Sequence, residues 1–343
     1  KEKYICHQDL MSESVPVPVS VPEKEKEEEE GEQPVNIIPE EVERFAPDDP
    51  KLKDYLDTHG FVVIKSVMDS THIVTAKEKL WNFLEETAGI MREDKSTWTA
   101  DRFENVGMAQ NGIICNGIGQ TDYMWYVRCL PKVKQAFSTV HDTDDLLCSM
   151  DGGNIFFPWH REESWNHLKT ETGWYHVDQG IKLRGRQCVQ GLVSLTDASA
   201  GTGGLCLIPG STKFHDELVE QTGIETNFVE VPPSFHALNQ KQILPMCKAG
   251  DMILWDSRTI QCSTPALETP SHSPDELLRI AAYVCMTPRR LAGNDVLQNR
   301  MQAYMRDMTL HHWPHIITHE ISDRDPIVRQ FTDAPSEIRT LIA

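Results

Sequence analysis

Short apolar runs, separated by Gly, Pro and Asp, dominate the middle of the chain. The runs cover residues 188–196, 204–208, 251–256 and 279–286. Another β-rich run over 61–65 follows Gly60. Runs of this length with such punctuation are typical of β-strands. Several of them close together favour a β-sandwich or barrel over alternating βαβ units.

Helical patterns flank this β-rich centre. A predicted N-cap at Asp69 opens one helix, and Gly89 suits its end. A second helix is expected over 131–140. Asn294 is predicted to cap a last long helix that ends by Pro314. Helices around a β-rich centre indicate one α+β domain with a mainly β core.

The N-terminal segment 1–38 has a different composition from the rest of the chain. Its alternating Val-Pro stretch resists helix formation, and residues 1–35 hold ten acids against four lysines. We therefore expect a disordered acidic tail, followed by a single domain over 39–343 with a C-terminal helical extension. The tail is interpreted as a solvated segment or as a docking site for a protein partner.

The overall charge narrows the possible partners. The 343 residues carry 52 acids and 33 bases, a formal charge of -19. Because no dense basic surface is available for phosphates, a nucleic-acid partner and an anionic membrane are not expected.

The cysteines indicate a reducing compartment. There are nine, with scattered spacing and no C-x-x-C motif. The sequence shows neither an 18-residue apolar stretch nor a signal-peptide pattern, so a cytoplasmic location is expected.

The segment 173–179 carries the most informative pattern, because His176 and Asp178 are two residues apart in a predicted strand. Such residues project from the same face, so an imidazole and a carboxylate can meet at one metal ion. On its own, the pair is more typical of a core histidine beside a surface aspartate than of a metal site.

The surrounding segments strengthen the metal interpretation. Segments 190–197, 203–211, 249–259 and 279–289 follow in order. With the entry strand at 61–65, this order resembles the phytanoyl-CoA dioxygenase-like branch of the Fe(II)/2-oxoglutarate oxygenases over about residues 50–290. The resemblance implies a double-stranded β-helix, a jelly-roll or cupin-like barrel, with flanking helices.

The resemblance also implies Fe(II) and 2-oxoglutarate as cofactors. His176 and Asp178 would be iron ligands, and Arg279 would bind the remote carboxylate of 2-oxoglutarate. Gln190 would lie near that co-substrate. A planar, permanently charged guanidinium suits a carboxylate. The alternatives are a salt bridge from Arg279 to Glu276 or Asp275 and an ordinary polar strand position for Gln190.

One position departs from the family pattern. The distal iron-binding histidine should stand two residues after Thr259, but Gln261 occupies that place. His272 lies eleven residues further on, in a Ser/Pro-rich loop. Three outcomes follow: iron bound with Gln261 at the third corner, co-substrate binding without turnover, or an inactive scaffold.

Weaker candidates lie elsewhere. The loop 159–165 is a possible substrate entrance, and the aromatic segments 97–128 and 155–174 suit an apolar substrate or plain packing. Four residues near the metal motif either bind an acidic substrate or belong to a solvated strand edge: Tyr175, Lys182, Arg184 and Arg186. Four histidines near the C-terminus are either zinc ligands or, more simply, ordinary surface residues: His311, His312, His315 and His319.

The resemblance thus implies an oxygenase that hydroxylates a small or apolar substrate. The alternative is a catalytically inactive relative that acts as a structural or protein-interaction subunit. The residue that separates the two hypotheses is Gln261.

Overall fold

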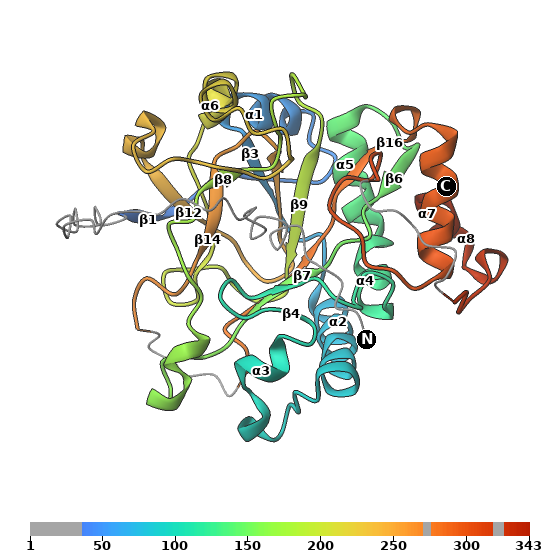
Figure 1. The fold of residues 1–343 in the computed structure, drawn as a ribbon, viewed down its shortest axis with the longest axis horizontal. Coiled ribbons are helices and arrows are strands. Elements are labelled where there is room, and N and C mark those ends of the chain that lie inside the picture. The colour runs from blue at the N-terminus through green and yellow to red at the C-terminus, as the bar shows by residue number, and fades with distance from the viewer. Residues whose placement is uncertain (1–35, 270–275, 318–325) are drawn as a thin grey trace, which may run out of the picture.

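The computed structural model describes residues 36–269, 276–317 and 326–343. The predicted tail therefore lies almost entirely outside the described residues, as do Asp275, His272 and His319. Two large β-sheets form the centre of the molecule, and most helices lie on one side of them (Figure 1).

The chain alternates between the two sheets in the manner of a jelly roll. The larger sheet has the order β2(Arg44–Phe45), β3(Phe61–Ile64), β13(Met252–Asp256), β9(Val189–Ser194), β15(Arg279–Tyr283), β7(Gly153–Phe156), β5(Ile113–Ile114) and β4(Gly107–Met108). The smaller has the order β1(Ile37–Glu41), β12(Gln242–Met246), β10(Gly204–Leu207), β14(Gln261–Thr264), β8(His176–Val177) and β11(Val229–Glu230). From β7 to β15, consecutive strands repeatedly change sheet, and their neighbours pair antiparallel. This topology confirms the predicted double-stranded β-helix.

Helices and one short sheet complete the described residues. The α-helices are α1(Lys51–His59), α2(Ser70–Phe83), α3(Ala100–Phe103), α4(Asp122–Arg128), α5(Pro131–His141), α6(His215–Thr222), α7(Asn294–Met305) and α8(Ser336–Ile342). A π-turn, η2(Leu84–Ala88), extends α2, and the 3-10 helices are η3(Lys95–Thr97), η4(Glu163–Leu168), η5(Ser211–Phe214), η6(His236–Asn239), η7(Arg289–Leu291) and η8(Phe331–Asp333). Strand β16(Met286–Pro288) pairs with β6(Leu146–Cys148). No helix of the described ranges is long and apolar enough to span a membrane.

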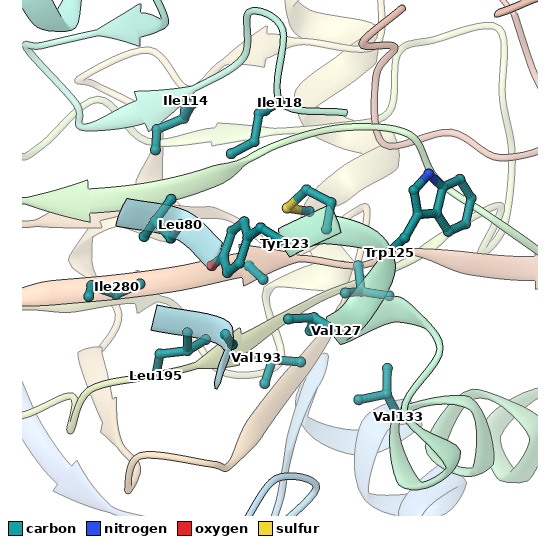
Figure 2. Packing of buried hydrophobic residues seen from close by; sticks show 14 of the residues in the cluster. Leu80, Ile114, Ile118, Tyr123, Trp125, Val127, Val133, Val193, Leu195 and Ile280 are labelled. Carbon is teal, nitrogen blue, oxygen red and sulfur yellow. The ribbon is translucent and has the colours of Figure 1, made fainter. Parts of the chain in front are cut away.

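The outer face of the larger sheet is covered by helices. Val193 of β9 and Ile280 of β15 pack against Leu80 of α2 and Tyr123 of α4 in one buried apolar cluster (Figure 2). This burial removes apolar surface from water and fixes the helices on that face. The inner face is therefore left to meet the second sheet.

The space between the sheets is part apolar and part polar. Leu192 and Ile253 of the larger sheet contact Leu205 and Leu207 of the smaller one in a second cluster. Because side chains alternate along a strand, this contact identifies which residues of each strand face inward. The same alternation places several polar side chains inside.

Two details of the helices differ from the sequence prediction. Asn294 is the first residue of α7 rather than its N-cap, which is Gly293, and α7 ends at Met305, well before Pro314. A further helix, α8, follows it. Strand β1 begins at Ile37, two residues before the expected boundary at 39, and pairs in parallel with β12.

Candidate active site

The predicted pair, His176 and Asp178, lies in the inter-sheet space at one end of β8. His176 pairs with Gln261 of β14, which in turn pairs with the inward-facing Leu207. Directly paired residues share a face, so these side chains point inward. The His176 Nε2 and Asp178 Oδ1 atoms are 3.7 Å apart, and both residues are buried. The two-residue spacing therefore does bring the imidazole and the carboxylate together.

The surroundings of His176 keep its ring neutral. Its Nδ1 lies 3.2 Å from the carbonyl of Trp174, to which it donates a hydrogen bond. Burial lowers the pKa of His176, and the nearby Asp178 carboxylate opposes that shift only in part. A neutral ring with Nδ1 protonated leaves the Nε2 lone pair directed at the site, which is the state a metal ion requires.

Gln261 occupies the third corner of this group. Its Nε2 lies 2.6 Å from His176 Nε2 and donates to Asp178 Oδ2 at 2.9 Å. In the described ranges, no three His, Cys, Asp or Glu side chains are close enough together to hold a metal ion. The position predicted for the missing histidine is thus filled by a carboxamide, and no other ligand of these types replaces it there.

Arg279 lies on the same inner surface, on β15. Ala281, two residues along, belongs to the inter-sheet cluster, so Arg279 also points inward. Its guanidinium lies 4.9 Å from the centre of the Phe156 ring, and its Nη1 is buried without a hydrogen-bond partner in the described ranges. Burial lowers the pKa of Arg279. A buried, unpaired guanidinium is costly unless an anion accompanies it.

The predicted alternative partner of Arg279 lies elsewhere. Glu276 pairs with Lys77 at 3.6 Å and with Arg92 at 3.4 Å, both on the molecular surface. A strand-edge salt bridge from Glu276 to Arg279 is therefore wrong. The unmet hydrogen-bonding capacity of Arg279 instead faces the inter-sheet space.

Gln190 contributes to the same space, together with residues that the sequence did not single out. Gln190 pairs directly with Trp255 across β9 and β13. The buried atoms Gln190 Oε1, Trp255 Nε1 and Asn154 Oδ1 all lack a hydrogen-bond partner in the described part of the chain. Buried polar groups are normally satisfied, so this concentration of unmet donors and acceptors marks a ligand-binding interior.

Tyr283 completes this inner row on β15. Burial raises its pKa to about 12, against the opposing effect of Arg279, so its hydroxyl remains a donor at neutral pH. Neither Tyr283 nor Asn154 belongs to a recognisable motif. Tyr283 lies on the same face of β15 as Arg279, four residues further along. Asn154 lies opposite Ala281 on the neighbouring strand β7. Only this strand pairing identifies the two residues as part of the inner face.

The donor set fits the implied cofactors at two points. A neutral imidazole and a carboxylate suit Fe(II), and the unpartnered Arg279 Nη1 suits the remote carboxylate of 2-oxoglutarate. Gln261 is the weak position, because a carboxamide can ligate only through its neutral oxygen.

The basic residues near the motif do not line this interior. Lys182 pairs with Glu225, Arg184 with Asp216 and Glu220, and Arg186 with Asp57. These are surface ion pairs, so the solvated strand edge is the better description.

Tyr175 is likewise directed away from the inter-sheet space. It packs in the cluster on the outer face of the smaller sheet and donates to Gln242 Oε1 at 2.8 Å. The expectation that it receives an acidic substrate is wrong because its neighbour His176, not Tyr175, takes the inward position.

The aromatic segments largely serve packing. Trp165 stacks on Trp98 with ring centres 5.7 Å apart, and Tyr123 and Trp125 belong to the helix-side core (Figure 2). That core lies on the opposite face of the larger sheet from His176. These aromatic side chains therefore do not line the inter-sheet space.

Of the four histidines near the C-terminus, His319 lies outside the described residues, so the structure does not test a zinc site that includes it. His315 lies in a turn, is buried and bonds Thr287 Oγ1 at 3.2 Å. His312 is more notable, because its Nε2 is buried without a partner in the described residues and its backbone carbonyl lies 3.8 Å from Cys188 Sγ, two residues before Gln190. The sequence pattern placed His312 in a candidate zinc or surface cluster, and the structure instead places it, with its Nε2 buried, near β9.

The chain is similar to several known proteins. The chain is 27% identical over 282 residues to the Ava biosynthesis cluster protein O of Aspergillus versicolor, covering 77% of this chain and 85% of that protein. Two solved structures are similar at lower identity. EctD from S. alaskensis with 2-oxoglutarate and 5-hydroxyectoine is 16% identical, with 74% of this chain and 80% of that one covered and a TM-score of 0.47. The carbocyclase SnoK from nogalamycin biosynthesis is 14% identical, with coverages of 71% and 87% and a TM-score of 0.48.

The family comparison covers most of the fold described above. The phytanoyl-CoA dioxygenase (PhyH) family model matches residues 56–266, a range that contains His176, Asp178 and Gln261. The resemblance inferred from the motif order is thereby confirmed, and the chain belongs to the phytanoyl-CoA dioxygenase family.

Proposed function

We propose that this protein is an Fe(II)/2-oxoglutarate-dependent oxygenase that hydroxylates a small or apolar substrate. The observation that carries the proposal is the convergence of His176, Asp178 and the unpartnered Arg279 on one buried inter-sheet space. Membership of the phytanoyl-CoA dioxygenase family supports it.

The chain's own residues would have distinct roles. His176 and Asp178 would hold the iron, and Gln261 lies beside them in the place of the family's third ligand. Arg279 would bind the remote carboxylate of 2-oxoglutarate and orient the co-substrate, while Gln190 would offer it a hydrogen-bond acceptor or donor. The surrounding apolar residues of both sheets would exclude bulk water from the site.

The cofactor would supply the oxidative chemistry. When bound, Fe(II) would allow O₂ and 2-oxoglutarate to convert a substrate C–H to C–OH, with succinate and CO₂ as the other products. This balance assigns one oxygen atom to the substrate and one to succinate. It requires no general acid or base from the protein.

Anaerobic titration with Fe(II) and 2-oxoglutarate tests the proposal. The expected result is a metal-to-ligand charge-transfer absorption band that needs both components. The variant Asp178→Ala should lose the band because it removes the charged ligand. Absence of the band in the wild-type protein would overturn the proposal.

One observation favours a second candidate function, an inactive family member that acts as a structural or protein-interaction subunit. The Gln261 carboxamide already satisfies both His176 and Asp178 without a metal ion. For this candidate, the expected result of the same titration is a protein that stays folded and shows no charge-transfer band. Partner binding through the acidic tail would then be tested by pull-down with and without residues 1–35.

A further inference from the structure

The carboxamide nitrogen of Gln261 sits where two hydrogen-bond acceptors converge. His176 donates through Nδ1 to Trp174, so its Nε2 offers only a lone pair. The Asp178 carboxylate, when ionised, is also only an acceptor. An amide NH₂ group carries two N–H donors, and the distances of 2.6 Å to His176 Nε2 and 2.9 Å to Asp178 Oδ2 place one toward each.

These two lone pairs are the same ones that would bind a metal ion. His176, Asp178 and Gln261 are all buried, with 4%, 7% and 7% of their surfaces exposed. Without Gln261, both acceptors would depend on trapped water or remain unsatisfied, which is costly in a buried site. The carboxamide therefore stabilises the metal-free site in the arrangement that a metal would need.

We infer that Gln261 is a hydrogen-bonding placeholder that competes with the metal ion for His176 and Asp178, rather than a third metal ligand. This inference rests on the proposed function, because it concerns the same iron site. Metal binding would break both hydrogen bonds and displace the carboxamide. The affinity of the protein for metal would consequently be held down by Gln261.

The opposite role makes the opposite prediction. If the carboxamide oxygen were a ligand, the amide would be turned away from its observed hydrogen bonds, and removing it would weaken metal binding. If the NH₂ group is a placeholder, removing it frees the two acceptors for the metal. The sign of the change in affinity on truncating Gln261 separates the two roles.

The experiment is anaerobic equilibrium dialysis against Fe(II), with bound metal measured by elemental analysis. Gln261→Ala should bind Fe(II) about tenfold more tightly than wild type, which corresponds to about 1.4 kcal/mol. The same variant should melt at a lower temperature without metal, because it loses the bridging hydrogen bonds. Neither readout depends on catalytic activity.

Two further variants control for the fold. Gln261→Asn keeps the amide but is one methylene shorter and cannot span both acceptors, so its affinity should rise in the same direction. Ser263→Ala changes the next inward residue of β14, which is also buried, and should leave Fe(II) affinity unchanged.

The outcomes distinguish the inference from the proposed function. A fall in Fe(II) affinity of tenfold or more in Gln261→Ala, with Ser263→Ala unchanged, would overturn the placeholder role and leave the oxygenase proposal intact. Failure of the wild type and of every variant to bind Fe(II) would overturn both.

Discussion

At the scale of single residues, the contrast between two buried arginines shows where function costs stability. Arg300 donates to the carbonyls of Ile342, Pro314, Cys148 and Leu341. Arg279 is just as buried, but its Nη1 has no partner among the described residues. A fully hydrogen-bonded guanidinium supports the fold, whereas an incompletely bonded one costs stability, and we propose that Arg279 is retained to bind a ligand.

This contrast predicts opposite effects of the same substitution. Arg279→Met should raise the free energy of unfolding by about 1 to 4 kcal/mol, because it removes a poorly compensated buried charge. Binding of 2-oxoglutarate should be lost. Urea unfolding and calorimetric titration measure the two quantities.

Arg300→Met is the matched control. It should lower the free energy of unfolding by about 3 to 5 kcal/mol, because four buried carbonyls lose their donor. A loss of stability in Arg279→Met as large as in Arg300→Met would show that Arg279 has a structural partner.

Local spacing was enough to predict some site residues but not others. His176 and Asp178 share a face because they are two apart in one strand, and the sequence alone shows that. Asn154 and Tyr283 join the site only through the pairing of β7, β15 and β9. His312 approaches from a segment after α7. Such long-range register has no local signature in a single sequence.

At the scale of elements, two glycines at helix ends differ in how closely neighbouring atoms pack against them. Gly60 ends α1 with φ of 76°, and Gly223 ends α6 with φ of 66°. A side chain at Gly60 would meet Thr259 Oγ1 at 2.7 Å, whereas nothing lies within 4 Å of one at Gly223. Of these two glycines, Gly60 combines a left-handed backbone with close packing, whereas Gly223 has the left-handed backbone alone.

The two glycines therefore predict a graded loss of stability. Gly223→Ala should cost about 1 kcal/mol, which is the expense of the left-handed conformation alone. Gly60→Ala should cost clearly more, because Thr259 must also move. Chemical denaturation compares the variants, and equal losses would contradict the packing argument.

The elements themselves were largely predictable where a pattern was regular. The Asp69 cap of α2 and the strands near 189–194 and 252–256 follow from sequence. The prediction for the C-terminal helix was wrong at both ends. Its N-cap is Gly293 rather than Asn294, and α7 stops at Met305, after which the chain turns back to the β-sheets. The helix ends in a local turn, in which Asp307 has a left-handed backbone with φ of 58° and the Met308 N–H donates to the Ala303 carbonyl.

At the scale of the whole molecule, the partly buried His141 and the buried His315 make stability depend on pH. Burial lowers the pKa of His141 to about 4, although its hydrogen bond with the Met286 carbonyl opposes the shift. Burial likewise lowers the pKa of His315 to about 4. In the unfolded chain these rings titrate near 6.5.

Because the folded pKa is depressed, the unfolded state binds more protons between these values. The contribution of these two histidines to the free energy of unfolding is therefore greatest above about pH 6.5, and it is lost as the pH drops toward 4. His141→Gln, which keeps a donor for Met286, should reduce the loss between about pH 7 and 5 by about 2 kcal/mol. Urea unfolding at both pH values measures it, and an unchanged loss would refute the assignment.

The acidic surface must also be reconciled with an anionic co-substrate. Outside the N-terminal 35 residues, the chain carries 42 acids against 29 bases, so the overall field repels a dicarboxylate. Attraction must come from local charge. We propose that Arg279 supplies it, because it is buried and its Nη1 has no hydrogen-bond partner among the described residues.

Succinate formation tests the central claim most directly. Wild-type protein is incubated with Fe(II), 2-oxoglutarate and O₂, with ascorbate as the reductant in place of substrate, and succinate is quantified by mass spectrometry. We predict succinate equal in amount to the 2-oxoglutarate consumed, and none from Arg279→Met or Asp178→Ala. Wild-type protein that is folded and loaded with Fe(II) but yields no succinate above these variants would contradict the account.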